Sequence, residues 1–163
     1  DITTGRFPLR LMARRVADAA STPYAVSVYD TLGNDGGADV SATTTLLSQA
    51  RYRTSRGWER VTTRRAVGGV AIKATERGER ASATIPRGAY GVVAQRGPDA
   101  GRIRILVDGE RVRSIDLRSA RHHSRAVVWV SPSFVQPGHR ITIVTATSRP
   151  VALDGLVRLR QSN

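Results

Sequence analysis

Apolar and polar residues alternate through much of the chain, and the alternation breaks at turn residues. Residues 102–108 and 111–117 each alternate in this way, with Asp108-Gly109 between them. An Asp-Gly pair between two alternating segments is a strong signal of a two-residue hairpin turn. The pattern therefore predicts an antiparallel β-hairpin over residues 102–117.

The same rhythm predicts a series of short strands after residue 57. Gly and Pro separate most of them, and no segment has a convincing helical period. The predicted strands are 58–63, 70–74, 80–85, 89–95, 102–108, 111–117, 125–131, 139–146 and 152–159. Short strands at this spacing are typical of an all-β fold, an antiparallel two-sheet β-sandwich or jelly roll.

The first 56 residues are predicted to form an extended N-terminal strand segment. Residues 24–30 alternate as a strand, and residues 8–17 fit a strand better than a helix. Residues 38–56 are rich in Thr, Ser and Ala, which is interpreted as an extended connector. The expected organisation is therefore this segment and connector, residues 1–56, followed by a sandwich domain, residues 57–163.

A series of short turn and core motifs runs through residues 57–160. They are Gly57-Trp58-Glu59-Arg60-Val61, Gly97-Pro98-Asp99-Ala100-Gly101, Val107-Asp108-Gly109, Ile115-Asp116-Leu117-Arg118-Ser119, Val127-Val128-Trp129, Pro137-Gly138-His139-Arg140-Ile141-Thr142-Ile143 and Asp154-Gly155-Leu156-Val157. In this order they resemble the β-sandwich modules of secreted actinobacterial proteins, which are similar to carbohydrate-binding jelly rolls. The resemblance implies an extracellular or cell-surface location and a role in binding or adhesion.

Residues 24–34 carry the pattern Tyr-x-Val-x-Val-x-Asp-x-x-Gly-Asn. This pattern is similar to a late strand of the fibronectin type III or immunoglobulin-like domains that often precede such a module. Residues 1–56 are too few for a full domain of that type. The segment is therefore interpreted as part of such a domain, or as an assembly arm that docks on the sandwich or on another subunit.

The chain is strongly basic, with 26 basic residues, 13 acidic residues and a formal net charge of +13. All the basic residues except Lys73 are arginine. Arginine binds phosphate, sulfate and carboxylate in a bidentate way, so the composition favours a polyanionic partner, although a high-GC codon supply produces the same bias. The chain has no cysteine for disulfides or thiolate metal sites, and no run of about 18 apolar residues that predicts a membrane-spanning helix.

The predicted binding surface combines one aromatic ring with an arginine face. Aromatic rings stack on sugar faces, and Trp58 is the better exposed candidate, although a role in sealing the end of the core explains it as well; Trp129 is interpreted as a core residue. The hairpin brings arginines together on a face that suits an anionic polymer, although a solvated face shared with Glu110 and Asp116 explains the pattern as well. The candidate ligand-binding residues are Trp58, Arg102, Arg104, Arg111, Arg113, Arg118 and Arg121.

The sequence predicts no enzyme activity. Ser124, His122 and Asp116 can be drawn as a Ser-His-Asp arrangement, but the chain carries no local signature of an activated nucleophile. The acidic residues have explanations as turn or loop residues, so no carboxylate pair for glycoside hydrolysis stands out.

No cofactor is predicted. His122 and His123 are adjacent, and on a strand they would point to opposite faces rather than share a metal ion. A structural calcium ion held by the loop carboxylates Asp99 or Asp154 is kept as an alternative.

These observations leave three functions. The preferred one is a non-catalytic binding or adhesion module for cell-wall or other polysaccharide, anionic polymers included. The second is a structural subunit of a surface filament, appendage or virion, in which copies assemble by strand addition through residues 1–56. The third is nucleic-acid binding through the arginine face, although the chain lacks interleaved aromatic residues.

Overall fold

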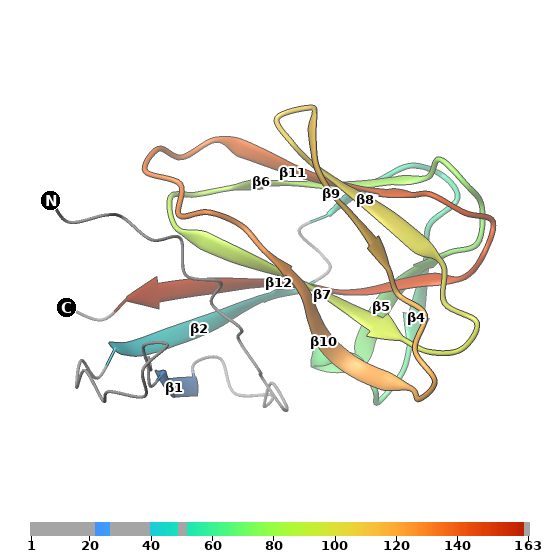
Figure 1. Ribbon diagram of the computed structural model, residues 1–163, viewed down its shortest axis with the longest axis horizontal. Helices are drawn as coiled ribbons and strands as arrows, with labels where there is room; N and C mark the ends of the chain where they lie inside the picture. Colours follow the sequence, from blue (N-terminus) through green and yellow to red (C-terminus); the bar gives the residue numbers. More distant parts are fainter. Residues whose placement is uncertain (1–21, 27–39, 49–51, 162–163) are drawn as a thin grey trace, which may run out of the picture.

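The computed structural model describes residues 22–26, 40–48 and 52–161, and most of them lie in β-strands (Figure 1). The strands form two antiparallel sheets that pack face to face. This arrangement confirms the predicted all-β, two-sheet sandwich. Within these residues no helix is long and apolar enough to cross a bilayer.

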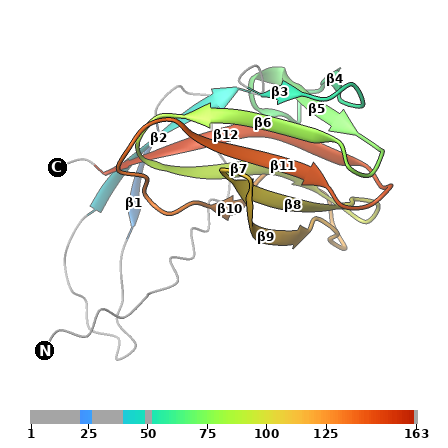
Figure 2. The same cartoon turned by 90° about the horizontal axis from the view of Figure 1, so that it is seen from above.

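The smaller sheet has five strands that follow one another across one layer of the sandwich (Figure 2). In spatial order they are β3 (Arg53–Thr54), β6 (Arg80–Ile85), β11 (His139–Thr145), β8 (Arg102–Val107) and β9 (Glu110–Asp116). β9 is an edge strand whose side chains are almost all exposed. Its arginines and a register shift opposite Ile105 and Leu106 make this edge a poor template for pairing with another chain.

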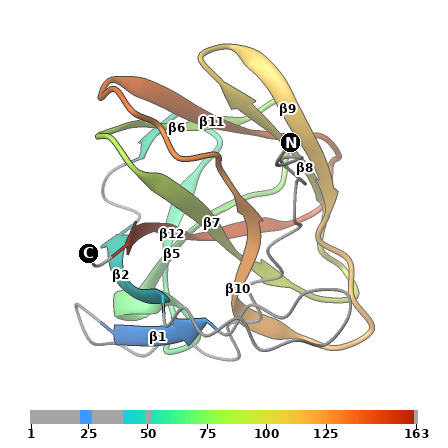
Figure 3. The same ribbon diagram turned by 60° about the vertical axis from the view of Figure 1, so that its left-hand side comes forward.

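The larger sheet has seven strands arranged around the long strand β12 (Figure 3). They are β1 (Thr22–Val26), β2 (Val40–Ser48), β4 (Glu59–Thr62), β5 (Val70–Ala74), β7 (Ala89–Arg96), β10 (His123–Val130) and β12 (Val151–Gln161). β7 lies beside β12 and pairs in turn with β10. Along its other edge, β12 pairs first with β5 and then, from Gly155 onward, with β2. The neighbour changes next to Asp154, at a register shift in the pairing of β12 with β7.

Apolar side chains that alternate along both sheets form the core between them. The largest fully buried residues are Tyr90, Ile85, Ile103, Ile105, Leu117, Ile141, Ile143, Leu153, Leu156, Val92, Val93 and Val151. Trp129 is half-buried and packs against this core, which agrees with its interpretation as a core residue. Removal of these apolar surfaces from water is the main force that holds the two sheets together.

The Asp108-Gly109 turn forms as predicted. Both residues have positive φ, 52° and 92°, as a type I′ hairpin turn requires. The Asp108 carboxylate accepts a hydrogen bond of 2.7 Å from the Arg140 N–H and lies 2.6 Å from Nδ1 of His139. The hydrogen bonds from His139 and Arg140 lower the pKa of Asp108. The turn is thereby tied to the start of β11.

All nine strands predicted after residue 57 are present, with ends that differ by no more than two residues. The region expected as a connector, residues 38–56, contains β2 and β3, which are hydrogen-bonded to β12 and β6. Threonine suits a pleated surface, so a Thr-rich segment is compatible with a paired strand. β1 covers the start of the strand expected at residues 24–30.

The rest of that expected strand, the ambiguous residues 8–17 and most of the proposed assembly arm lie outside the described residues. Docking of the arm on another subunit therefore stays a prediction.

Candidate functional site

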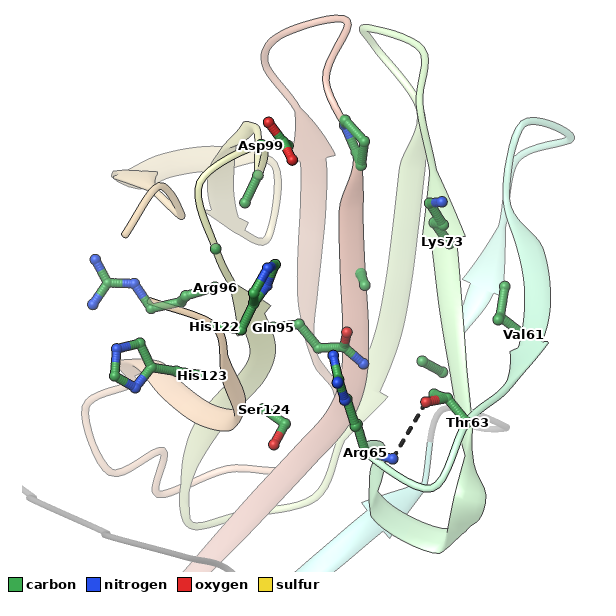
Figure 4. A pocket seen from close by; sticks show the side chains of 15 residues that line it. Val61, Thr63, Arg65, Lys73, Gln95, Arg96, Asp99, His122, His123 and Ser124 are labelled. Carbon is green, nitrogen blue, oxygen red and sulfur yellow. Dashed lines mark hydrogen bonds between the residues drawn. The ribbon is translucent and has the colours of Figure 1, made fainter. Parts of the chain in front are cut away.

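A groove of about 540 Å³ lies on the outer face of the larger sheet (Figure 4). We call it the outer-face groove. Strands β4, β5, β12 and β7 supply its floor, and residues 122–124, at the start of β10, form part of one wall. Its lining residues are Val61, Thr63, Arg65, Ala71, Lys73, Gln95, Arg96, Gly97, Asp99, Ala100, His122, His123, Ser124, Pro150 and Ala152.

Strand alternation explains why these residues face away from the core. Ile72 and Leu153 are core residues that pair in register, so their neighbours Lys73 and Ala152, which also pair, point to the opposite face. Ala71 lies on the same face as Lys73, and its side chain is as short as that of Ala152. Small side chains on the floor leave the space that a ligand would fill.

The groove carries a net positive charge. Arg65, Lys73 and Arg96 line it, and Asp99 is the one lining carboxylate. Among the described residues, no carboxylate lies within ion-pair distance of these three cations. Their charges are therefore available to a ligand.

The close-up view separates the lining side chains into two groups. Figure 4 shows Arg65 and Gln95 directed toward the middle of the groove, whereas Arg96 and His123 project away from its floor. Arg96 donates a hydrogen bond of 3.2 Å to the Arg118 carbonyl oxygen, which holds it on the outer side of the wall. Arg65 and Lys73 are thus the cations nearest to a ligand on the floor.

Asp154, two residues after Ala152 on β12, is a buried neighbour of the groove that contacts the lining residue Gln95. It is fully buried, and its two carboxylate oxygens accept hydrogen bonds from Gln95 Nε2 (3.1 Å) and from the Arg125 N–H (3.2 Å). Burial raises the pKa of Asp154 to about 6, against the opposing effect of these two donors and of the Arg125 charge. The carboxylate therefore fixes the Gln95 side chain and the backbone of β10 in place.

Arg125 continues this support across the sheet. It has a φ of 58° at an irregularity in β10, and its guanidinium donates hydrogen bonds of 3.1 to 3.4 Å to the carbonyl oxygens of residues 64–66. These three residues form the turn that carries Arg65. Arg125 and Asp154 are positioning residues for the groove, because they hold the segments from which Arg65 and Gln95 project.

His122 lies directly on Gly97 at the wall of the groove. A Cβ atom added to Gly97 would sit 2.6 Å from Nδ1 of His122, which is closer than real contacts allow. The missing side chain of Gly97 therefore leaves the space that the imidazole ring of His122 occupies.

Trp58 does not provide an exposed ring. Its side chain is only 8% exposed and belongs to the core cluster. The sequence placed it at the start of a strand, where exposure was expected, but the residue packs inward and closes the core. This corrects its assignment as the better exposed aromatic platform.

None of the six candidate arginines lines the outer-face groove, and four of them lie on the paired strands β8 and β9 of the other sheet. Arg102 forms an ion pair of 3.0 Å with Asp116, as the solvated-face interpretation anticipates. Arg111 and Arg113 line a second, more open recess of about 380 Å³ along β9. The remaining three are Arg104 on β8, which is half-buried, and Arg118 and Arg121, which are exposed between β9 and β10. A binding role for these arginines stays a prediction.

The Ser-His-Asp arrangement does not assemble. His122 and Ser124 line the groove, but Asp116 lies on β9 and accepts hydrogen bonds from Arg102 and from the Arg118 N–H. The backbone hydrogen bond from Arg118, with the contribution of Arg102, lowers the pKa of Asp116. In the described ranges no three His, Asp or Glu side chains are grouped as a metal site requires.

Sequence reasoning missed the residues that define the groove. A signal for Lys73 existed, because it alternates with Ile72 and Ala74 and must face outward. Gln95 and Arg96 are polar residues at the end of an otherwise apolar strand. Their proximity to Lys73 depends on the order of β5, β12 and β7, which pair over long sequence separations and leave no local pattern.

Comparison with known proteins places the chain by its fold. No protein-family model matches the chain, and no curated protein sequence matches it. Several solved structures do match the fold of this chain. A two-domain esterase active on acetylated mannans, co-crystallized with mannopentaose, has a TM-score of 0.57 at 11% identity, over 74% of this chain and 37% of the esterase chain.

Two further structures share this similarity. The catalytic unit of a GH87 α-1,3-glucanase from Streptomyces thermodiastaticus has a TM-score of 0.54 at 23% identity, over 78% of this chain and 27% of that chain. An exo-β-1,3-galactanase from Phanerochaete chrysosporium, with β-1,3-galactotriose, has a TM-score of 0.54 at 15% identity, over 72% of this chain and 29% of that chain. This chain spans less than two fifths of each, and the similarity shows a shared β-sandwich fold.

Proposed function

We propose that this protein is a non-catalytic polysaccharide-binding module of a secreted or cell-surface protein, and that the polysaccharide lies in the outer-face groove. The observation that carries the proposal is an open groove of about 540 Å³ with a floor of small side chains. Its volume falls in the usual range of ligand sites, about 300 to 1,000 Å³. The polar side chains of Thr63, Gln95 and Ser124 suit the hydroxyl groups of a sugar.

The similar structures support the same class of ligand. The named proteins are an esterase active on acetylated mannans, an α-1,3-glucanase and an exo-β-1,3-galactanase. All three names refer to polysaccharides as substrates. The part of each chain that resembles this protein is a minority of its length, as expected for a module that accompanies another domain.

The chemistry of the groove supports binding rather than hydrolysis. Most glycoside hydrolases place two carboxyl groups on either side of the scissile bond. Asp99 is the one carboxylate among the described lining residues, and Asp154 is buried outside the lining, with both oxygens engaged in hydrogen bonds. His122 and Ser124 lack the third member that would orient them as a nucleophile pair.

Filling the floor of the groove is the test. Ala152→Phe places a large ring where the ligand is proposed to lie, and we expect it to weaken polysaccharide binding by at least about tenfold. The measurement is affinity electrophoresis in gels that contain mannan, β-glucan, galactan or polygalacturonate. Thr84→Phe is the matched control, because Thr84 is exposed on β6 of the other sheet and we expect no change there.

Two results would contradict the proposal. One is that the wild-type protein is retarded by none of the polysaccharides. The other is that Ala152→Phe, with its thermal unfolding unchanged, binds as well as the wild-type protein and Thr84→Phe.

A further inference from the structure

We infer that the outer-face groove selects an acidic polysaccharide, in which carboxylate groups on the sugar residues pair with Arg65 and Lys73. This inference rests on the proposed function and names its substrate class. It is carried by three features of the groove: unpaired cations, an absence of lining aromatic rings, and rigid support for the cationic side chains.

The first feature is the charge that the groove presents. Arg65 and Lys73 come from opposite ends of the β4–β5 hairpin region, and both lack a carboxylate partner in the described part of the chain. Arg102 on the other sheet shows the contrast, because Asp116 neutralises it at 3.0 Å. Glu59 lies opposite Lys73 on β4, but it forms no ion pair with it, so a carboxylate of the ligand can pair with either groove cation.

The second feature is the composition of the walls. No Trp, Tyr or Phe appears among the described lining residues. A neutral glycan gains much of its binding from stacking on such rings. The large rings of the described strands and loops lie elsewhere: Tyr52, Trp58 and Tyr90 are in the core, Trp129 packs against it, and Phe134 stacks on His139 with ring centroids 4.4 Å apart. Ion pairs with the ligand must therefore provide the part of the binding free energy that stacking on aromatic rings does not.

The third feature is preorganisation. Lys73 lies on β5 between two paired strands, β4 and β12. The turn that carries Arg65 is held by the guanidinium of Arg125 through three backbone carbonyl oxygens. Fixing these segments before the ligand arrives reduces the entropy lost on binding. Arginine also offers a planar fork that matches a carboxylate.

The absence of aromatic rings from the lining favours a polyuronate over a nucleic acid. Single-stranded nucleic acids bind grooves in which positive charge is combined with aromatic side chains that stack on the bases. The described lining residues supply the positive charge but no aromatic ring. A polyuronate carries one charge per sugar residue together with hydroxyl groups, which matches mixed cationic and uncharged polar walls.

The first experiment compares two polymers that differ only in charge. Polygalacturonate and its carboxyl-reduced form, a neutral galactan, are titrated into the protein by calorimetry at low ionic strength. We expect the acidic polymer to bind at least about tenfold more tightly than the reduced one. We also expect its affinity to fall as salt is added, because screening weakens ion pairs at a partly open site.

The second experiment removes one cation at a time. Lys73→Met and Arg65→Gln are each expected to weaken polygalacturonate binding by about fivefold to tenfold and to leave the reduced polymer unaffected. Arg53→Gln is the matched control. Arg53 is exposed on β3 of the other sheet, so the variant removes the same charge far from the groove, and we expect less than about a twofold change.

The outcomes separate the inference from the proposed function. Equal binding of the acidic and reduced polymers overturns the inference and leaves polysaccharide binding in place. An equal loss of polygalacturonate affinity in Arg53→Gln and Lys73→Met also overturns it, because the effect is then one of net charge. Tighter binding of single-stranded DNA than of polygalacturonate, with the same sensitivity to Lys73→Met, overturns the ligand class. Binding of neither polymer, nor of any in the gel panel, contradicts the proposed function itself.

Discussion

Replacing Asp154 by Asn is expected to remove a large pH-dependent contribution to folding stability. The pKa of Asp154 is raised from 3.8 to about 6 in the folded protein because its carboxyl group is buried. Between these two values the folded state holds a proton that the unfolded state has released. The wild-type protein should therefore lose stability as the pH rises through this interval, and the Asn variant should not.

The size of this change in folding stability follows from how far the pKa of Asp154 is raised. Between about pH 4.5 and pH 7.5, ionisation of Asp154 costs about 2 kcal/mol of the free energy of unfolding. Asn keeps the shape of the side chain, and its oxygen can accept from the Arg125 N–H while its amide group meets a reoriented Gln95. The stability of the variant relative to the wild-type protein should thus be about 2 kcal/mol greater at the higher pH.

Urea denaturation of both proteins at the two pH values measures this difference. The other ionisable groups are common to both proteins, so their contributions cancel in the comparison. If the free energy of unfolding changes with pH in the same way for the wild-type protein and Asp154→Asn, the carboxyl group is not held in a buried, desolvated position.

Leu153→Ala is expected to cost about 3 kcal/mol of folding stability. Leu153 is completely buried in β12, where it pairs in register with Ile72 of β5 and Ala94 of β7. Its side chain lies in the core cluster between the two sheets. Truncation removes apolar contacts and leaves a cavity that strands held on both sides cannot readily close.

Urea denaturation at a single pH measures this cost. Val135→Ala is the control, because Val135 is 88% exposed and its truncation should change the free energy of unfolding by less than about 0.5 kcal/mol. Similar stabilities of the two variants would mean that Leu153 does not lie between the packed sheets.

Local pattern was enough to predict the individual strands of the sandwich. The Asp108-Gly109 turn and the alternation of Ile103 and Ile105 depend on neighbouring residues, so they can be read from the chain itself. β2 was harder, because its Thr-rich sequence lacks a clear apolar face. It forms a strand because β12 offers a partner more than 100 residues further along the chain.

The candidate site was much less predictable. The hairpin arginines were predicted to bind a ligand because adjacent strands bring them together, yet Arg102 forms an ion pair with Asp116. The groove joins Lys73, Arg65 and Gln95 through pairings of distant strands. The positive φ of Arg125 and the burial of Asp154, which hold this arrangement, have no signature in the order of residues.

The most direct measurement is a map of ligand contacts by NMR. A ¹⁵N-labelled sample is titrated with galacturonate oligosaccharides, and the shifts of backbone amides are followed. Binding in the outer-face groove predicts that the amides of Lys73, Gly97, Ser124 and Ala152 shift most, while those of β8 and β9 stay in place. Shifts confined to β8 and β9, with the groove amides unchanged, would contradict the account.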